Sequence, residues 1–295
     1  MITVATHNGT FHADDCFAFA ILKAAHQGAV TLVRTRDLEA LDRADVVFDV
    51  GGSCDPAEGR YDHHMRDKPL RDNGEPFSSA GLVWRDYGVR AIRALLPQVT
   101  DSEAAEIAAM VDSGLIRDVD LMDNGAMAPT PGHFSTVLEA FNPSFAEPGR
   151  DENDAFAEAA ALAGQVLVRT IARAHAAVLA AETVAAAAKA AEDPRIVVLE
   201  TRVPWEDAVF DLNLTQALYV VRPAGKQWTV SAVPPERNSF AQRKPLPEAW
   251  GGLRDEQLAQ VSGVADATFC HPARFVCGAI SREGAVRLAR LAAEA

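Results

Sequence analysis

Short aliphatic segments alternate with longer amphipathic ones over the first third of the chain. Ile2–His7, Val30–Arg34 and Val46–Val50 are rich in aliphatic and β-branched residues, as the buried strands of a parallel sheet are. A helix is expected between the first two, around Cys16–Ala25. Because strands that alternate with helices form βαβ units, this pattern predicts an α/β domain with a parallel sheet.

A polar loop and two further helices are expected next. Asp67–Pro76 is rich in turn-forming residues and predicts the loop. Residues that cap helices then begin two helical patterns, one running from Ser78 or Ser79 toward Leu96 and one from Asp101 or Ser102 toward Arg117.

A long Ala-rich segment separates the two ends of the chain. Asn142–Asp154 contains two prolines, a glycine and several charges, and predicts a boundary there. From Ala155 to about Ala191 the pattern predicts a helix that would extend over roughly 50 Å and end before Pro194. A helix or helix pair packed inside the protein explains its apolar stripe better than a coiled coil with a partner does.

The last hundred residues have a different character. Strands are expected at Arg195–Glu200, Ala217–Arg222 and Gln227–Val233, and helices at Asp255–Val261 and Arg282–Ala293. This α+β pattern predicts a smaller second domain. The expected organisation is therefore a catalytic domain over 1–150, a helical connector over 151–194 and an α+β substrate domain over 195–295.

Length, charge and cysteine usage narrow the class of protein. The 295 residues include 28 basic and 41 acidic side chains, for a net charge of −13. That charge argues against a protein that coats nucleic acid electrostatically, but it allows an acidic site filled by cations. The sequence contains no C-x-x-C pair, no signal-peptide pattern and no run of about 18 apolar residues. We therefore expect a cytoplasmic protein with reduced cysteines and no membrane association.

Histidines and carboxylates follow the predicted strands of the first domain. His7 ends the first strand, His12-Ala-Asp14-Asp15 opens the next helix, and Asp49 comes before Gly51-Gly52. Asp62-His63-His64 follows shortly afterwards. Because ligands gather at the carboxyl ends of parallel strands, these side chains are expected to converge on one edge. Imidazole and carboxylate together suit Mn²⁺, Zn²⁺, Fe²⁺ or Mg²⁺.

A pair of such ions stabilises both the attacking and the leaving oxygen in phosphoryl transfer, and Asp49 is the natural bridging carboxylate. The glycines after it would let a phosphate approach the backbone. Simpler explanations exist for each residue alone: a hydrogen-bonded histidine at a strand end, acidic residues that stabilise a helix N-terminus, or a turn. Their joint occurrence along an α/β pattern favours the metal site.

The same segments carry a resemblance to a known family. The motifs are T-H-N-G-T-F-H-A-D-D at 6–15, V-F-D-V-G-G at 47–52, R-Y-D-H-H at 60–64, S-S-A-G-L-V-W at 78–84, D-V-D-L-M-D-N-G at 118–125, L-P-E-A-W-G-G-L-R-D-E-Q-L at 246–258 and S-R-E-G-A at 281–285. Together they resemble the MYG1 family, a branch of the DHH phosphoesterase superfamily. The likeness spans nearly the whole chain and implies a DHH-type catalytic domain with a DHHA1-like second domain.

The resemblance also implies the metal ligands. They would be His7, His12, Asp14, Asp49, His63 and either Asp123 or Asp120, holding two divalent ions, typically Mn²⁺, with Mg²⁺ or Zn²⁺ as alternatives. The first motif departs from the H-x-x-x-D-x-D of the superfamily, because a histidine stands one position later than the usual aspartate.

Two further residues of the motif would assist the chemistry. His64 would act as general acid for the leaving oxygen, and Asp62 would orient a neighbouring imidazole. Both Asp120 and Asp123 are expected just after a helix, and the turn predicted at Asn124-Gly125 favours Asp123.

The second domain offers candidate substrate contacts. Arg237, Arg243 and Lys244 surround Phe240, a combination that suits single-stranded nucleic acid, although a solvated loop with one buried phenylalanine fits equally well. Gly251 and Gly252 could present N–H groups to a phosphate or could simply lead into a helix.

The function implied by the resemblance is a 3′–5′ exonuclease that hydrolyses single-stranded RNA by a two-metal mechanism, with Asp49, Asp62 and His64 in catalytic roles. A second hypothesis keeps the site but assigns smaller substrates: pyrophosphate, short oligonucleotides or cyclic dinucleotides. A third is a non-catalytic protein that binds metal or nucleic acid. The sequence leaves homodimer formation open.

Overall fold

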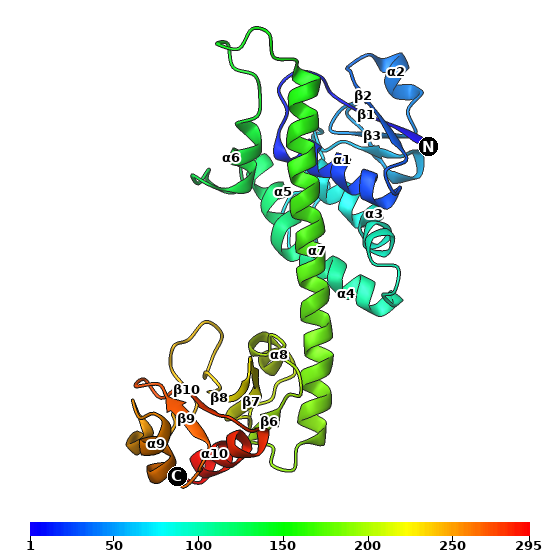
Figure 1. The fold of residues 1–295 in the computed structure, drawn as a ribbon. Coiled ribbons are helices and arrows are strands. Elements are labelled where there is room, and N and C mark those ends of the chain that lie inside the picture. Colours follow the sequence, from blue (N-terminus) through cyan, green and yellow to red (C-terminus); the bar gives the residue numbers. More distant parts are fainter. The chain divides into compact units, whose positions relative to one another are not determined.

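Two five-stranded sheets, one in each half of the chain, organise the protein (Figure 1). The computed structural model describes all residues from 1 to 295. It divides into two units, Met1–His175 and Ala176–Ala295. Both sheets contain parallel and antiparallel pairs, so the protein is of the α/β class with two mixed sheets.

The first sheet has the strand order β2-β1-β3-β5-β4. Its strands are β1 (Ile2–Thr6), β2 (Val30–Arg34), β3 (Val46–Phe48), β4 (Cys54–Asp55) and β5 (Arg60–Tyr61). The first three confirm the predicted strands. The expectation of an all-parallel sheet is wrong at one edge, where β4 runs antiparallel to β5. Only the short 3₁₀ turn η1 (Pro56–Glu58) and Gly59 (φ +68°) join these two strands, too little chain for a parallel crossover.

Helices cover both faces of this sheet (Figure 1). On one side α1 (Ala13–Ala25) packs against α3 (Ser79–Leu95). On the other, α2 (Leu38–Asp42) buries Leu41 against Ala5 and Val47. The helix predicted around Cys16–Ala25 and the one ending near Leu96 are confirmed, whereas the short α2 was not predicted.

The helical run after residue 100 differs from its prediction in two ways. Its cap is Thr100, whose hydroxyl accepts from the Glu103 N–H at 3.2 Å, rather than Asp101 or Ser102. It also continues past Arg117: α4 (Asp101–Val111) is followed by the π-helical turn η2 (Asp112–Ile116) and by α5 (Arg117–Asp123). This longer run matters because it carries two candidate metal ligands. Helix α6 (Phe134–Glu139) follows.

The Ala-rich segment forms one continuous helix, α7 (Glu152–Ala190). In the first unit its Phe156 contacts Phe11 edge to face at 5.5 Å, and in the second unit its Val184 packs with Val197. By length and composition α7 could cross a membrane, with a mean hydropathy of 1.3 over its most apolar 18 residues. Long helices inside soluble proteins share that property, so it is weak support for a membrane span.

The second sheet has the order β6-β7-β8-β10-β9. Its strands are β6 (Ile196–Val198), β7 (Tyr219–Ala224), β8 (Gln227–Ala232), β9 (Ala267–Cys270) and β10 (Val276–Ala279). One face packs on α10 (Arg282–Glu294) and α9 (Asp255–Ser262), and the other on α8 (Glu206–Asp211) and the end of α7. The 3₁₀ turn η3 (Glu248–Trp250) precedes α9. The three predicted strands and two predicted helices are confirmed; β9, β10 and α8 were not predicted.

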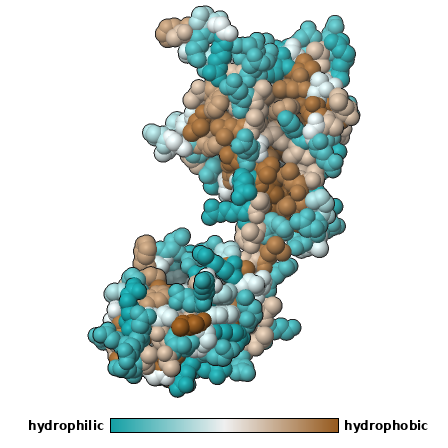
Figure 2. Space-filling view, viewed as in Figure 1, coloured by the Kyte–Doolittle hydropathy of each residue, from teal (hydrophilic) through white to brown (hydrophobic).

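An apolar groove of about 870 Å³ lies in the first unit between α1, the end of α3 and the first half of α7. Phe19, Leu32, Leu95 and Val168 contribute to its lining. Figure 2 shows apolar residues gathered on this part of the surface. No histidine or carboxylate lines the groove, so it is separate from the candidate chemistry.

Candidate metal centre

The predicted ligands gather at the carboxyl ends of three strands. His7 comes directly after β1, Asp49 after β3, and Asp62-His63-His64 after β5. The chain leaves β1 toward β2 on one side, while β3 lies on its other side, so the strand order reverses at β1. Such a reversal opens a crevice at the carboxyl ends of the strands, where ligands bind in open α/β sheets.

Asp49 lies between two histidines. Its Oδ2 is 3.1 Å from Nε2 of His7, and its Oδ1 is 3.2 Å from Nε2 of His63. The backbone of Asp49 is left-handed (φ +58°), and Gly51 (φ +102°) and Gly52 (φ +68°) continue the tight turn. This conformation turns a buried carboxylate so that its two oxygens face different neighbours, as a bridging ligand requires.

The start of α1 supplies three more candidate ligands, one of which the sequence did not identify. Asp15 Oδ2 accepts the His12 backbone N–H at 3.0 Å and lies 3.2 Å from Nε2 of His7. His7, His12 and Asp15 therefore form one group in which the potential ligand atoms all lie within 4.8 Å of one another. The spacing His12-x-x-Asp15 matches a capping box, which explains why the sequence indicated a helix-start residue at Asp15 rather than a ligand.

Helix α5 brings Asp123 to the same place. Its Oδ2 is 3.2 Å from Nε2 of His63, and it forms a second group with His12 and Asp14. Asp123 is the last residue of α5 and Asp120 lies inside it, so the expectation that both follow a helix is wrong. The turn predicted at Asn124-Gly125 is confirmed.

Asp120 lies outside every group of potential metal ligands. Both of its carboxylate oxygens are instead bound by hydrogen-bond donors. Its Oδ1 accepts from the Ser78 N–H at 3.1 Å, the Ser78 hydroxyl at 2.6 Å and the Gly81 N–H at 3.0 Å, and its Oδ2 binds Arg71. Ser78 therefore uses its hydroxyl on Asp120 instead of capping α3. The structure brings Asp123, not Asp120, to the cluster.

His64 and Asp62 have the arrangement expected of a proton donor and its positioning partner. Asp62 Oδ1 accepts from the His64 backbone N–H at 3.0 Å and lies 2.9 Å from His64 Nδ1. Asp62 is buried and its other oxygen accepts the Gly52 N–H at 2.5 Å, whereas the His64 side chain is 61% exposed. The pair thus holds the imidazole at Nδ1 and leaves Nε2 available on the open side.

Ser79 also contacts the cluster; it lies in the S-S-A-G-L-V-W motif but was not predicted as a site residue. Its hydroxyl donates to Asp49 Oδ1 at 3.2 Å, and its backbone N–H donates to Asp14 Oδ2 at 3.3 Å. Both donors stabilise ionised carboxylates at the start of α3.

Burial and mutual repulsion disturb the titration of this cluster. Burial raises the pKa of Asp14, and the charge of Asp49 raises it further. Burial acts on Asp49 in the same direction, but His63 and His7 outweigh it and lower the pKa of Asp49. For His7, burial opposes protonation, yet Asp15 and Asp49 raise its pKa to about 10. His63 has a raised pKa as well, because Asp49 and Asp123 outweigh burial and the charge of Lys68.

The donor set fits divalent ions. Oδ1 of Asp14 and Oδ1 of Asp15 are buried without a hydrogen-bond partner, which is costly unless a cation satisfies them. The overlapping groups also include Asp49 with His63 and His64, and Asp14 with Asp15 and Asp49. A mixture of imidazole nitrogens and carboxylate oxygens suits Mn²⁺, Fe²⁺, Zn²⁺ or Mg²⁺.

The basic residues of the second unit that were predicted to contact the substrate are bound to other groups of the protein. Arg237 pairs with Asp207 and Asp211. Arg243 donates to the carbonyls of Leu214 (2.7 Å) and Ala217 (2.9 Å), and Lys244 donates to that of Ala293 (3.0 Å). These three cations are engaged in holding the unit together.

Of the other predicted substrate contacts, the phenylalanine is exposed, whereas the N–H groups of the two glycines are already hydrogen-bonded. Phe240 is 99% exposed, so the alternative of a buried phenylalanine is wrong. Gly252 donates its N–H to the carbonyl of Cys270 at 3.0 Å, and Gly251 donates to that of Glu248 at 3.1 Å. Neither N–H is therefore free for a phosphate.

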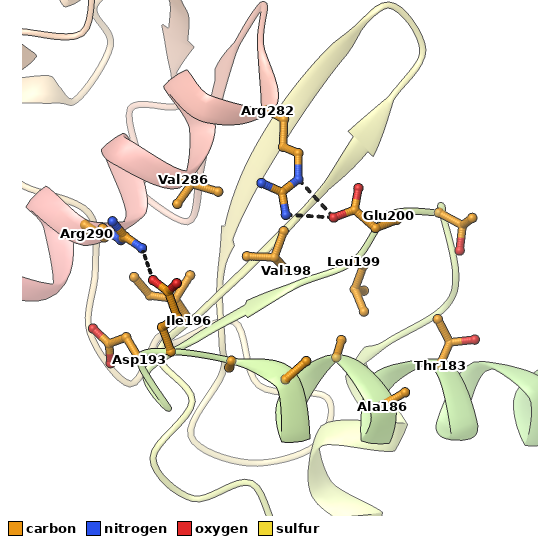
Figure 3. Close-up of a pocket in the computed structure, with 15 residues that line it drawn as sticks. Thr183, Ala186, Asp193, Ile196, Val198, Leu199, Glu200, Arg282, Val286 and Arg290 are labelled. Atoms are coloured by element: carbon orange, nitrogen blue, oxygen red, sulfur yellow. Dashed lines mark hydrogen bonds and ion pairs between the residues drawn. The ribbon is translucent and has the colours of Figure 1, made fainter.

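A groove of about 600 Å³ in the second unit lies between the end of α7, β6 and α10 (Figure 3). Its two arginines are paired: Arg282 with Glu200 at 2.7 Å and Arg290 with Glu192 at 2.9 Å. The groove contains no histidine or cysteine among its lining residues. It offers no second metal cluster.

Comparison with known proteins adds relatives over the full length of the chain. MYG1 exonuclease from Homo sapiens is 33% identical over 319 residues, covering 97% of this chain and 84% of the relative. For MYG1 exonuclease from Bos taurus the identity is 34%, with 97% and 83% covered. The MYG1 protein from Schizosaccharomyces pombe is 31% identical, with 99% and 97% covered.

A solved structure of RecJ from Thermus thermophilus in complex with Mn²⁺ aligns with 18% identity and a TM-score of 0.30. The alignment covers all of this chain and 52% of the RecJ chain, so this chain spans about half of that protein. A TM-score of this size does not establish a common fold. The sequence profile of an uncharacterised protein family (UPF0160), the MYG1 exonuclease family, matches residues 3–293. With that match and relatives above 30% identity along its length, the chain belongs to the MYG1 family.

Proposed function

We propose that the protein is a metal-dependent phosphodiesterase that hydrolyses single-stranded RNA from its 3′ end. The observation that carries the proposal is the position of Asp49, with one oxygen facing His7 and the other facing His63. A carboxylate of this kind can bridge two ions, and the histidines and carboxylates around it would complete both coordination shells.

The residues divide into two groups around Asp49. His7, His12 and Asp15 would hold one ion, and His63 with Asp123 would hold the other, while Asp14 lies within reach of both groups. Two divalent ions held there would supply electrostatic stabilisation of the attacking and leaving oxygens of a phosphodiester. Ser79 keeps Asp49 and Asp14 oriented through its two hydrogen bonds.

His64 is assigned the protonation of the leaving oxygen. Asp62 fixes its Nδ1 side, and the exposed Nε2 side is the one a substrate would meet. Such a pair supplies a proton at a fixed place.

Exonuclease activity is proposed because relatives across most of this chain's length carry that name. RNA as substrate, the 3′–5′ direction and Mn²⁺ as the ion rest on the family resemblance of the motifs. Hydrolysis of pyrophosphate, short oligonucleotides or cyclic dinucleotides would use the same centre. The net charge of −13 and the engaged cations of the second unit suit such small substrates.

The test uses metal-stripped protein, Mn²⁺ and a single-stranded RNA labelled at its 5′ end. We expect a ladder that shortens from the 3′ end with the wild type and with His271→Ala, whose ring Nδ1 only accepts a backbone N–H. Asp49→Asn, which keeps the shape of the side chain, should abolish the ladder. His64→Gln should lower kcat while Mn²⁺ binding, measured calorimetrically, stays unchanged.

Other outcomes would contradict specific parts of the proposal. Intact RNA together with hydrolysed pyrophosphate would overturn the substrate class, and an active Asp49→Asn variant would overturn the metal centre. Binding of RNA without turnover of any phosphoester would favour a non-catalytic binding protein.

A further inference from the structure

One basic side chain next to the metal centre is not engaged with an acidic partner. Lys68, in the loop after His64, donates from Nζ to the Asn124 side-chain oxygen at 2.9 Å. Asn124 directly follows Asp123, and its own Nδ2 donates to the carbonyls of Phe77 and Asp120, so it is firmly oriented. This bond holds the ammonium group beside the ligand-bearing end of α5.

Other basic side chains around this loop are engaged, except that of Arg66, which is exposed and has no partner. Arg71 is bound by Asp112 and Asp120, and Arg117 by Glu75. Arg34 donates to the carbonyls of Gly9 and Glu152. Lys68 differs from them because its partner is a neutral amide oxygen and its side chain is exposed. Its charge therefore remains available to a ligand.

The negative charge of the carboxylates at the centre explains why a basic side chain beside it would help to bind an anionic substrate. Asp14, Asp15, Asp49 and Asp123 contribute four negative charges, which two divalent ions would just neutralise. The centre would then carry little surplus positive charge, so a further cation beside it would strengthen the binding of an anionic phosphodiester. Lys68 is bonded to Asn124, which directly follows Asp123, and Asp123 Oδ2 lies 3.2 Å from Nε2 of His63. Lys68 lies on the same loop as the exposed His64, which marks the side open to substrate.

We propose that Lys68 binds a non-bridging phosphate oxygen of the substrate, exchanging its bond to Asn124 for a charge-assisted contact with the phosphate. The inference rests on the proposed phosphodiesterase function, for which it assigns the anion-binding residue. An ammonium group on a flexible stem can make this exchange without moving the loop.

The experiment compares Lys68→Met, which keeps much of the length but not the charge, with Lys68→Arg and with Arg66→Met. Arg66 is an exposed basic residue of the same loop, but it lacks the hydrogen bond to Asn124 that holds Lys68 beside the end of α5. With 5′-labelled single-stranded RNA and Mn²⁺, Lys68→Met should raise KM about tenfold and leave kcat within a factor of about three. The slope of log(kcat/KM) against log[salt] should become shallower by about 0.7, the value for one phosphate contact on a single strand. Lys68→Arg should restore most of the affinity, and Arg66→Met should behave as the wild type.

A second measurement does not depend on turnover. Adenosine 5′-monophosphate should raise the Tm of the Mn²⁺-loaded wild type and of Arg66→Met, but not that of Lys68→Met, while calorimetric Mn²⁺ affinity stays the same in all three. An unchanged salt slope together with an unchanged nucleotide-induced Tm shift in Lys68→Met would overturn the inference. A lowered Mn²⁺ affinity in Lys68→Met would also overturn it, because the lysine would then serve the metal centre itself. If the wild type does not cleave RNA, the proposed function fails while the nucleotide measurement still decides the role of Lys68.

Discussion

Asn142 holds the backbone of Phe11 through two hydrogen bonds. Its Oδ1 accepts the Phe11 N–H at 2.9 Å, and its Nδ2 donates to the Phe11 carbonyl at 2.8 Å. Phe11 immediately precedes His12, a candidate ligand, so an asparagine from the segment after α6 fixes the loop that carries this histidine. Outer contacts of this kind keep metal ligands in place before the ion arrives.

Replacement of Asn142 by alanine should therefore weaken metal binding by about tenfold, because the His12 loop gains freedom that binding must remove. Isothermal titration of Mn²⁺ into metal-free protein measures the effect. Asn153→Ala is the control, since its oxygen accepts only one long bond (3.4 Å) from Arg34. Equal Mn²⁺ affinity in Asn142→Ala and the wild type would show that the loop is held by other contacts.

Asp15→Asn should reduce Mn²⁺ affinity as strongly as Asp49→Asn does. Its Oδ2 lies 3.2 Å from His7 Nε2, and its buried Oδ1 has no hydrogen-bond partner. We expect a loss of at least about tenfold in calorimetric titration. Asp118→Asn, on the exposed side of α5, serves as the matched control. An Asp15→Asn variant with wild-type affinity and stoichiometry would remove Asp15 from the ligand set.

Gly81→Ala should destabilise the first unit. A Cβ at this position would overlap the Asp120 carboxylate, which has no room to move because Ser78 and Arg71 hold it. Overpacking of this kind costs about 1–3 kcal/mol. Gly114→Ala, where a Cβ meets nothing within 4 Å, should be neutral or stabilising by less than about 1 kcal/mol. Urea unfolding monitored by circular dichroism compares the two, and equal stabilities would mean that α3 shifts to make room.

The buried carboxyl of Asp120 should make stability depend on pH. Burial raises its pKa to about 6, although Ser78 and Arg71 act in the opposite direction. Because the folded-state pKa lies above the ordinary 3.8, the contribution of the protonated group is complete below about pH 3.8 and is lost as the pH rises to about 6. The loss from this group amounts to at most about 3 kcal/mol.

The free energy of unfolding, measured by urea titration in a chelator, should fall more steeply between pH 4 and pH 6 in the wild type than in Asp120→Asn, whose side chain does not titrate. The carboxylates of the metal centre titrate in both proteins, so the difference isolates Asp120. Parallel pH profiles for the two proteins would show that Arg71 and Ser78 keep Asp120 ionised throughout.

Much of the first unit follows from periodicity alone. The β1, β2 and β3 segments are aliphatic and short, and the intervening α1 is long enough to cross over, which leads to a parallel arrangement. Since the carboxyl ends of such strands meet at one edge, the convergence of His7, Asp49 and His63 was predictable. The antiparallel β4 was not, because two-residue strands carry no period.

The sequence by itself determined the α/β class, the long Ala-rich helix and most of the candidate metal cluster, because these depend on local patterns and on where strands end. Tertiary structure alone decided which carboxylates belong to the centre. Asp120 and Asp123 lie within one turn of the same helix, yet only the packing of α5 against α3 directs Asp120 to Ser78 and Asp123 to His63. It likewise decided that Arg243 and Lys244 bind main-chain carbonyls while Lys68 remains available. Such partners are distant in sequence, and only folding brings a charge and its acceptor together.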